Sequence, residues 1–218
     1  MNNKSAVIRQ ITETGVIPVI RANSSDEAMR AIDAIREGGV STMEITMTVP
    51  GAVKVMEEIA ARYGQEVLVG AGTVLDAETA RICILAGAQF VISPALNLET
   101  VLLCKRYGVC VMPGALTPTE VVAAWQAGAD FVKVFPAGAL GGANYIKSLK
   151  APLPQVEIVP TGGVSLKTAA DFIRAGASAL GVGADLVDLT ALKEGNAGLI
   201  TERARQYVAI VKEARENQ

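Results

Sequence analysis

The chain contains no histidine, only three cysteines and few aromatic side chains, and each of these shortages excludes some chemistry. Without histidine there is no Ser-His or Cys-His catalysis, and the commonest metal ligand of proteins is missing. Acid–base chemistry must therefore come from carboxylates, lysines, tyrosines or water. The cysteines are odd in number and have no metal-ligand spacing. We expect them to pack as small apolar side chains in a reducing compartment; they are Cys83, Cys104 and Cys110.

Charge and hydropathy argue against nucleic acid and against a membrane as partners. The net charge is −2 over 218 residues, which provides no electrostatic attraction to nucleic acid or to an anionic lipid surface. No apolar run approaches the ~20 residues of a membrane span, and residues 1–5 lack the apolar core of a signal peptide. We therefore expect a cytoplasmic protein. Half of the residues are hydrophobic, which suits an α/β protein with a large aliphatic core. The mean hydropathy is high for a chain of this size, so we expect some apolar surface to be buried in an oligomer.

Apolar, β-branched runs alternate with amphipathic segments along the whole chain. Glycine stands between each helical pattern and the next strand at several junctions, where it tolerates the left-handed cap that ends a helix. The predicted strands are residues 16–21, 40–46, 67–71, 89–93, 109–113, 130–135, 156–160 and 178–182. The predicted helices between them include residues 26–37, 52–62, 77–85, 98–107 and 119–126.

Eight strands that alternate with helices predict an α/β fold, the (β/α)8 or TIM barrel, as a single domain over residues 1–218. An additional helix from about residue 4 to 13 would cap the bottom of the barrel, and a last helix from about 196 to 214 would pack outside it. The alternative is a doubly wound open sheet. Against it, no Gly-x-Gly-x-x-Gly motif follows the first strand.

A lysine lies in the middle of an apolar strand. Side chains alternate in direction along a strand, so Phe131, Lys133 and Phe135 share one face. Lysine is rarely buried unless it is paired or functional, and apolar surroundings disfavour its charged form. A neutral amine attacks carbonyl groups and forms Schiff bases. Lys133 is therefore a candidate nucleophile; the alternative is a strand-end lysine whose ammonium group reaches water along its own stem.

The second strand carries a glutamate between two threonines of the same face, Thr42 and Thr46. The opposite face is apolar and would contact the helices of a barrel, which leaves Glu44 pointing inward. An inward carboxylate needs a partner or a function. Glu44 is therefore either an acid–base residue or half of a structural ion pair with Arg21 or Lys133.

Further candidates fall where the predicted strands end, which is the edge that carries active sites in such barrels. Arg21 ends the first strand, and its planar guanidinium suits a substrate carboxylate, although exposed strand-end arginines are common. Thr73 follows a Gly-Ala-Gly segment whose glycines allow a close approach to the backbone. Its hydroxyl could bind a ligand.

The loops after the seventh and eighth strands are rich in glycine. They contain Thr161-Gly162-Gly163 and Gly183-Ala184-Asp185, and a helix is predicted to start at Ser165. Many barrels bind phosphate with these two loops, through backbone amides and a short helix N-terminus. We therefore expect a phosphate site here rather than two tight turns.

Six motifs fall at strand ends in order along nearly the whole chain. They are residues 15–21 (GVIPVIR), 44–46 (EIT), 70–74 (GAGTV), 92–94 (ISP), 131–137 (FVKVFPA) and 160–164 (PTGGV). Together they resemble the 2-keto-3-deoxy-6-phosphogluconate (KDPG) aldolase family, which also contains 4-hydroxy-2-oxoglutarate (KHG) aldolases. The ordered set is far more specific than any one motif.

The resemblance implies a class I aldolase on a (β/α)8 barrel, usually a homotrimer, that needs no metal and no cofactor. It implies an aldehyde-lyase that cleaves KDPG to pyruvate and glyceraldehyde 3-phosphate through a lysine Schiff base, in the Entner–Doudoroff pathway of carbohydrate metabolism. A small-molecule 2-keto acid would be the substrate. Two alternatives stay open: a KHG aldolase that gives pyruvate and glyoxylate, and a phosphate-binding barrel enzyme, an isomerase or a synthase, that forms no imine.

The resemblance also implies a role for each candidate residue. Lys133 would be the Schiff-base lysine that attacks carbon 2, and Glu44 the acid–base residue that moves protons through a bound water. Arg21 and Thr73 would hold the pyruvate carboxylate. The pocket wall and the phosphate loops would supply the other substrate-binding residues: Pro94, Phe135, Thr161, Gly162, Gly163, Gly183 and Ala184.

Two positions depart from the pattern of the family. Some members carry an arginine four residues after the catalytic glutamate, where this chain has Thr48; others place it at the end of the first strand, as Arg21 is here. Many members have serine where this chain has Ala184, followed by Asp185. A lost hydroxyl removes a hydrogen bond worth about 0.5–1.5 kcal/mol, and an acid would repel phosphate unless it points away. Either the phosphate affinity is weaker or the preferred substrate is smaller.

Overall fold

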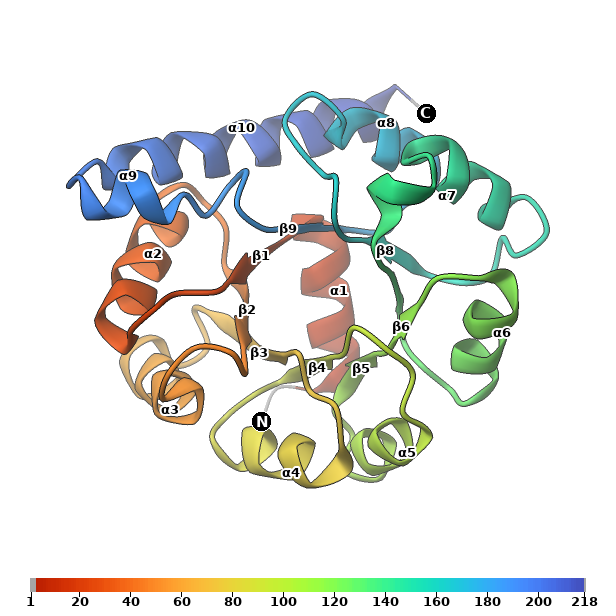
Figure 1. Cartoon of the computed structure of the whole chain (residues 1–218), viewed down its shortest axis with the longest axis horizontal. Coiled ribbons are helices and arrows are strands. Elements are labelled where there is room, and N and C mark those ends of the chain that lie inside the picture. The colour runs from red at the N-terminus through yellow and green to blue at the C-terminus, as the bar shows by residue number, and fades with distance from the viewer. Residues whose placement is uncertain (1–2, 218) are drawn as a thin grey trace.

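The computed structural model describes residues 3–217 and shows a closed ring of parallel strands surrounded by helices (Figure 1). The strands form two hydrogen-bonded sets, one in the order β5-β4-β3-β2-β1-β9 and the other in the order β6-β7-β8. Their bounds are β1 (Val16–Ile20), β2 (Thr42–Thr46), β3 (Leu68–Gly72), β4 (Phe90–Ile92), β5 (Cys110–Met112), β6 (Gly114–Ala115), β7 (Val132–Val134), β8 (Ile158–Pro160) and β9 (Leu180–Val182).

Single hydrogen bonds close the ring where the two sets meet. On one side Thr161 bridges to Gly181, and the Ser178 amide donates to the Ile158 carbonyl at 2.9 Å. On the other side the Lys133 amide donates to the Pro113 carbonyl, also at 2.9 Å. The predicted (β/α)8 barrel is therefore confirmed.

The fifth predicted strand, residues 109–113, corresponds to β5, and a further short strand that the sequence did not predict, β6, follows it. β5 ends at Met112 and β6 begins at Gly114. Pro113 lies between them, and proline has no N–H to donate to a ladder, so it interrupts regular pairing. Gly114 brings the chain back into register, where it pairs with Lys133 on β7.

The helices follow the strands in the order that the sequence predicts. Several begin at a side-chain cap, and α6 has a complete capping box between Thr117 and Glu120. Their bounds are α1 (Lys4–Thr14), α2 (Ser25–Glu37), α3 (Ala52–Tyr63), α4 (Ala77–Leu85), α5 (Leu98–Arg106), α6 (Pro118–Gln126), the 3-10 helix η1 (Ala137–Leu140), α7 (Ala143–Lys150), α8 (Ala169–Arg174), α9 (Leu189–Lys193) and α10 (Ala197–Glu216).

The helix expected from Ser165 starts later than predicted. The Thr168 amide donates to the Ser165 carbonyl in a turn, and α8 begins only at Ala169. The Thr168 hydroxyl accepts from the Ser165 amide at 2.9 Å and donates to the Gly163 carbonyl at 3.1 Å. Such bonds between side chain and backbone compete with the helical pattern, and here they keep the loop after β8 in a turn.

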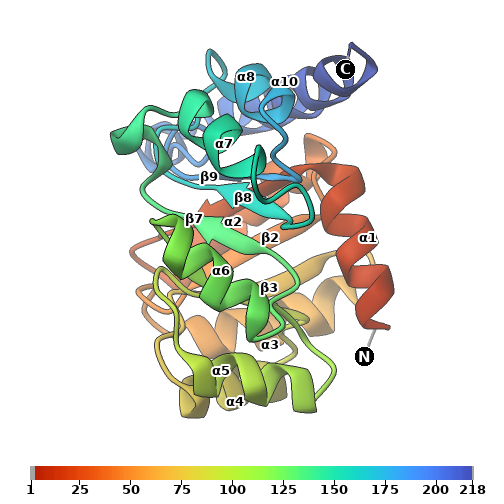
Figure 2. The same ribbon diagram turned by 90° about the vertical axis from the view of Figure 1, so that its right-hand side faces the viewer.

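Two apolar clusters divide the core. The inner cluster fills the barrel with strand side chains such as Phe90 and Phe131, and α1 closes one end of the ring with Val7 and Ile11 (Figure 2). The outer cluster lies between the other faces of the strands and the surrounding helices. Because Phe131 fills the interior, the next inward position on β7, Lys133, lies beyond the apolar plug toward the carboxyl ends of the strands.

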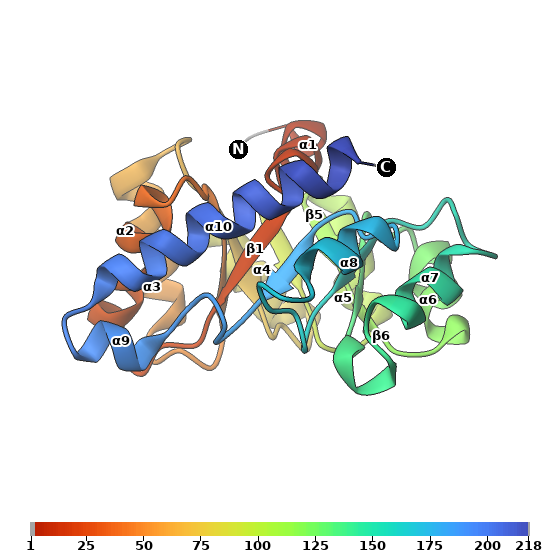
Figure 3. The same cartoon turned by 90° about the horizontal axis from the view of Figure 1, so that it is seen from above.

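The long helix α10 runs along the outside of the barrel, from α9 to a C-terminus near α1 (Figure 3). It contacts α2 and α8. None of the helices within residues 3–217 is both long and apolar enough to cross a membrane.

Candidate active site

Lys133 and Glu44 meet inside the barrel. Lys133 is 3% exposed and Glu44 is 1% exposed, and 3.9 Å separates Nζ of the lysine from Oε1 of the glutamate. The sequence offered Arg21 or Lys133 as a partner for this carboxylate, and the structure brings Lys133 to it. Within the described residues, Glu44 Oε1 accepts no hydrogen bond. An oxygen buried without such a bond is uncommon, and it is available to a substrate or a water.

A missing side chain on the neighbouring strand makes room for this carboxylate. Glu44 pairs in register with Gly70 on β3, and Gly72 is the next inward position. A Cβ on Gly72 would lie 1.9 Å from Glu44 Oε1, and a Cβ on Gly70 would lie 2.1 Å from the Phe90 ring. The two glycines therefore admit the functional carboxylate and the apolar plug beneath it.

The two other expected residues on this side belong to the segments that follow β3 and β4. Thr73 follows Gly72 directly and has a positive φ of 58°, which is uncommon outside glycine. Such strained positions concentrate at functional sites. Pro94 follows β4, and a Cβ on Gly114 would lie 2.2 Å from its carbonyl oxygen. The loop that carries Pro94 thus packs directly on the backbone of β6.

The remaining candidates surround one pocket of about 260 Å³ at the carboxyl ends of β1, β7, β8 and β9. Phe135 joins it to the pair of Lys133 and Glu44, because Lys133 Nζ lies 5.4 Å from the centre of the Phe135 ring. Thr73 and Pro94 do not line this pocket. The expected residues that line it are Arg21, Phe135, Thr161, Gly162, Gly163, Gly183 and Ala184.

Four residues of the two glycine-rich loops line the pocket and have backbone amides without partners in the described part of the chain. Within residues 3–217, the N–H groups of Gly162, Gly163, Val164 and Ala184 donate to no protein acceptor. Gly163 has a φ of 81°, and a Cβ there would lie 2.7 Å from Gly138 Cα, so no larger residue fits this turn. Free amides on neighbouring loops form an anion-binding concavity.

Arg21 lies beside the loop after β9. Strand β1 pairs with β9, and a Cβ on Gly183 would lie 3.6 Å from Arg21 Nη1. The guanidinium therefore brings a positive charge to the pocket that the free amides line. The sequence could not locate it there, because the neighbour of β1 across the closed barrel is the last strand of the chain.

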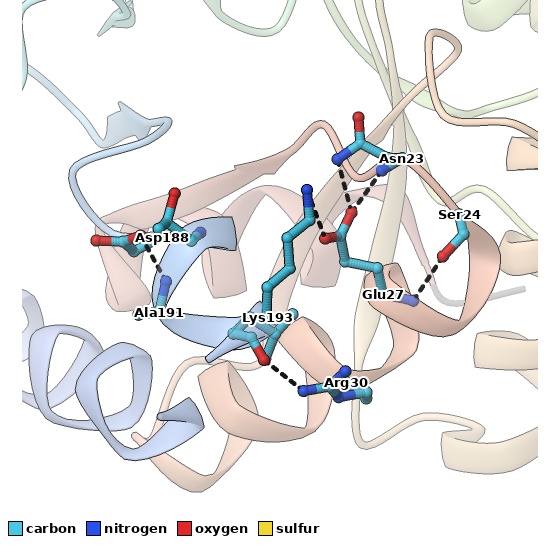
Figure 4. Close-up of polar contacts among 9 residues, drawn as sticks. Asn23, Ser24, Glu27, Arg30, Asp188, Ala191 and Lys193 are labelled. Carbon is cyan, nitrogen blue, oxygen red and sulfur yellow. Dashed lines mark hydrogen bonds and ion pairs between the residues drawn. The ribbon is translucent and has the colours of Figure 1, made fainter. Parts of the chain in front are cut away.

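A buried carboxylate holds the loop that follows Arg21 (Figure 4). Glu27 accepts hydrogen bonds from the Asn23 backbone amide at 2.6 Å and from the Asn23 side-chain amide at 2.9 Å. The backbone hydrogen bond from Asn23 is the main cause that lowers the pKa of Glu27, against its burial, which raises it. Lys193 of α9 lies 3.9 Å from the same carboxylate. The segment between β1 and α2 is thus tied to α9.

The pocket has four further lining residues, of which the sequence analysis had placed only Asp185 beside the expected phosphate. Val19, Val164, Gly181 and Asp185 also line it. A signal existed for two of them, since Val19 and Gly181 stand two positions before Arg21 and Gly183, on the same face of their strands. For Val164 and Asp185, which lie in loops, no periodicity applies.

Within the described part of the chain, no group of three or more histidine, cysteine, aspartate or glutamate side chains could hold a metal ion. What the site presents is a buried amine, a carboxylate with a free oxygen, a guanidinium and unpaired amides. The amine and the carboxylate suit covalent and proton-transfer chemistry. The guanidinium and the amides suit an anionic substrate.

Known proteins with similar sequences and structures point to one family. Residues 7–203 match the family described as KDPG and KHG aldolase. The 2-dehydro-3-deoxy-6-phosphogalactonate aldolase of Escherichia coli (strain K12) is 35% identical over 207 residues, covering 94% of this chain and 97% of that protein. The KHG/KDPG aldolase of the same organism is 34% identical over 95% of this chain and 98% of that protein.

A solved structure agrees with these relatives. The KDPG aldolase from Legionella pneumophila, with pyruvate captured at low pH as a covalent carbinolamine intermediate, is 30% identical to this chain. The two structures superpose with a TM-score of 0.84, over 94% of this chain and 97% of that one. This chain belongs to the KDPG and KHG aldolase family of class I pyruvate aldolases, which are aldehyde-lyases.

Proposed function

We propose that this chain cleaves KDPG to pyruvate and glyceraldehyde 3-phosphate through a Schiff base on Lys133. The observation that carries the proposal is the buried pair of Lys133 and Glu44, 3.9 Å apart, beside a pocket lined by unpaired amides. Relatives named for KDPG also support it. On this proposal the enzyme acts in the Entner–Doudoroff pathway of carbohydrate metabolism.

The reaction follows from the positions of the two side chains. Glu44 takes a proton from the Lys133 side chain, whose amine attacks carbon 2 of the substrate. Glu44 returns this proton to the oxygen on carbon 2, which leaves as water, and a protonated imine remains. Glu44 then takes the proton of the hydroxyl on carbon 4, and the bond between carbons 3 and 4 breaks. Its electron pair moves onto carbon 3 and into the imine, which becomes an enamine. The aldehyde leaves, carbon 3 takes back a proton, and hydrolysis releases pyruvate and the free lysine.

The other expected residues bind the substrate. Arg21 and Thr73 hold the carboxylate of the pyruvate half, and Pro94 and Phe135 form the wall beside it. The distal phosphate lies against the amides of the glycine-rich loops, where Thr161 also offers its hydroxyl. The amides that are free within the described residues support the assignment of the phosphate. The assignment of Arg21 and Thr73 to the carboxylate follows the family resemblance, and Arg21 also lines the pocket beside these amides.

Borohydride reduction in the presence of pyruvate tests the proposal, with intact-protein and peptide mass spectrometry as the readout. We expect a reduced pyruvate adduct on Lys133 in the wild type and none in Lys133→Ala. Folded protein that gives no adduct would support the alternative of a phosphate-binding barrel that forms no imine. Cleavage rates with KDPG, its C4 epimer and KHG then identify the aldehyde, and a preference for KHG would favour glyoxylate as the product.

We also propose that the chain forms a homotrimer through an apolar face on α4 and α5. Large apolar side chains are exposed along this face, at up to 69% for Leu85, and exposed clusters of this kind mark interaction sites. They are Leu75, Ile82, Leu85, Leu98, Leu102 and Tyr107. Sedimentation analysis should show a trimer, which Leu102→Glu dissociates. Leu140→Glu, on the distant η1, should leave it intact.

A further inference from the structure

We infer that Asp185 is a positioning residue that holds the loop after β9 against the turn before α8, so that the amides of both loops face one anion. The inference rests on the proposed function, which assigns these loops to the distal phosphate of the substrate. Asp185 lies at the edge of a site proposed for an anion, where a carboxylate would be expected to repel the ligand.

The carboxylate of Asp185 joins three separate parts of the chain. Its Oδ2 accepts from the Leu166 amide at 3.2 Å and from the Tyr207 hydroxyl at 2.5 Å. Leu166 belongs to the turn after β8, and Tyr207 belongs to α10. One oxygen thus links the last glycine-rich loop to the preceding one and to the outer helix.

Tyr207 anchors Asp185 to the core of the protein. Its side chain is fully buried. Burial and the hydrogen bond to Asp185 raise the pKa of Tyr207 well above its usual value, so its hydroxyl stays a proton donor. Helix α10 packs closely on the residue that ends α2, since a Cβ on Gly38 would lie only 2.4 Å from Ala204 Cβ. This close packing limits movement of the helix. The Thr201 hydroxyl also bonds the Ala34 carbonyl of α2, at 2.9 Å.

This arrangement answers the question raised by the sequence at Ala184 and Asp185. The carboxylate oxygen is engaged by two donors, so part of its charge is compensated by their dipoles. The amides of Gly162, Gly163 and Ala184 stay free within the described residues. Ala184 offers no hydroxyl, and the anion must be held by amides whose spacing depends on the two loops staying together. Asp185 keeps them together, and its effect on the anion is therefore favourable.

The test separates binding of the distal anion from chemistry at carbon 3. Cleavage of the phosphorylated substrate requires both. Exchange of the methyl protons of pyruvate with deuterated water, followed by NMR, requires Lys133, Glu44 and the groups that bind the pyruvate carboxylate, but not the site of the distal anion. We expect Tyr207→Phe to raise KM for the phosphorylated substrate about five- to tenfold, since one hydrogen bond of the link is lost. Asp185→Ala should raise it further, and both variants should exchange pyruvate at the wild-type rate. The inhibition constant of inorganic phosphate, a competitive inhibitor, should rise by the same factor as KM.

Tyr63→Phe is the matched control, because it also removes a hydrogen bond from a tyrosine hydroxyl to an aspartate, here Asp33, but joins α3 to α2 and not the two loops. We expect it to change neither assay. A lower KM in Asp185→Ala or Asp185→Asn would show that the carboxylate acts by repulsion, and would overturn the inference. So would an unchanged KM in Tyr207→Phe, which retains the charge and the ring and decides the question even if Asp185→Ala does not fold. A wild type that exchanges no pyruvate protons would instead contradict the proposed function.

Discussion

The carboxylate of Glu44 occupies the space that a side chain on Gly72 would fill. A Cβ at position 72 would lie only 1.9 Å from Oε1, and this oxygen is the one that faces Lys133. The location of Glu44, which we propose as the acid–base residue, thus depends on a glycine of the neighbouring strand.

Gly72→Ala should therefore displace Glu44 and lower kcat by about 100-fold, because a catalytic group moved by 1 Å loses that order of rate. The amine is not displaced, so borohydride should still trap pyruvate on Lys133. Steady-state kinetics and mass spectrometry measure the two effects. Gly198→Ala serves as the control, since its nearest neighbouring atom is 3.9 Å from the new Cβ. Wild-type kcat in Gly72→Ala would contradict this account of the site.

Glu44→Gln should separate imine formation from proton transfer. The amide keeps the size of the side chain but cannot act as a base, and general acid–base catalysis contributes about 10²- to 10⁴-fold. We expect cleavage and pyruvate proton exchange to fall together by that factor. Trapping of pyruvate on Lys133 should persist at equilibrium. If exchange in this variant equals that of the wild type, another group is the base.

Arg21→Lys tests which anionic group the guanidinium holds. A lysine retains the charge but loses the planar, two-pronged geometry that suits a carboxylate. If Arg21 binds the pyruvate carboxylate, as proposed, the concentration of pyruvate that half-saturates proton exchange should rise about tenfold, for a loss of about 1.4 kcal/mol. An increase confined to the phosphorylated substrate would assign Arg21 to the distal anion instead. Lys147→Arg, on the exposed face of α7, is the control, because it makes the reverse substitution outside the pocket and should leave proton exchange unchanged.

Glu27 should stabilise the fold in a way that depends on pH. The pKa of Glu27 is lowered from an ordinary value of 4.5, chiefly by the Asn23 backbone hydrogen bond. A carboxyl group with a lowered pKa in the folded state contributes stability that is complete above its unfolded pKa and is lost as the pH falls through the folded one. Glu27→Gln should thus destabilise the protein at pH 7, and the difference should shrink below pH 4.5.

Urea unfolding of the wild type and Glu27→Gln at several pH values measures this difference. Glu58→Gln, on the exposed face of α3, provides the comparison for loss of a carboxylate without the Asn23 contacts. A difference between the wild type and Glu27→Gln that stays constant down to pH 3 would show that the charge of Glu27 has no part in the effect.

The cysteines should be unreactive in the folded protein. All three are buried, as the sequence predicted. Burial raises the pKa of Cys83 to about 11 and that of Cys104 to about 12, and it raises the pKa of Cys110 as well. Because the thiolate is the reactive form, Ellman's reagent at pH 8 should modify native protein far more slowly than protein in urea. Rapid modification of one thiol without unfolding would indicate local opening.

The sequence alone determined the barrel and the chemical groups of its site. Alternation along a strand is a local property, so Lys133 and Glu44 could be assigned to inward faces without knowledge of any contact. The glycines that follow strands and helices mark boundaries for the same local reason. Several predicted boundaries differ from the observed ones by a few residues, and two of them, at Pro113 and at Ser165, lie where side-chain or proline chemistry competes with regular structure.

Only the tertiary structure decided which groups meet. The pairing of Lys133 with Glu44, the approach of Arg21 to Gly183 and the link from Asp185 to Tyr207 join segments far apart in the chain. Each depends on the register of neighbouring strands and on the closure of the ring, which arise from the packing of the whole core. A sequence pattern with a period of two specifies the face on which a side chain lies. Which side chains of other strands it contacts depends on the curvature and closure of the barrel.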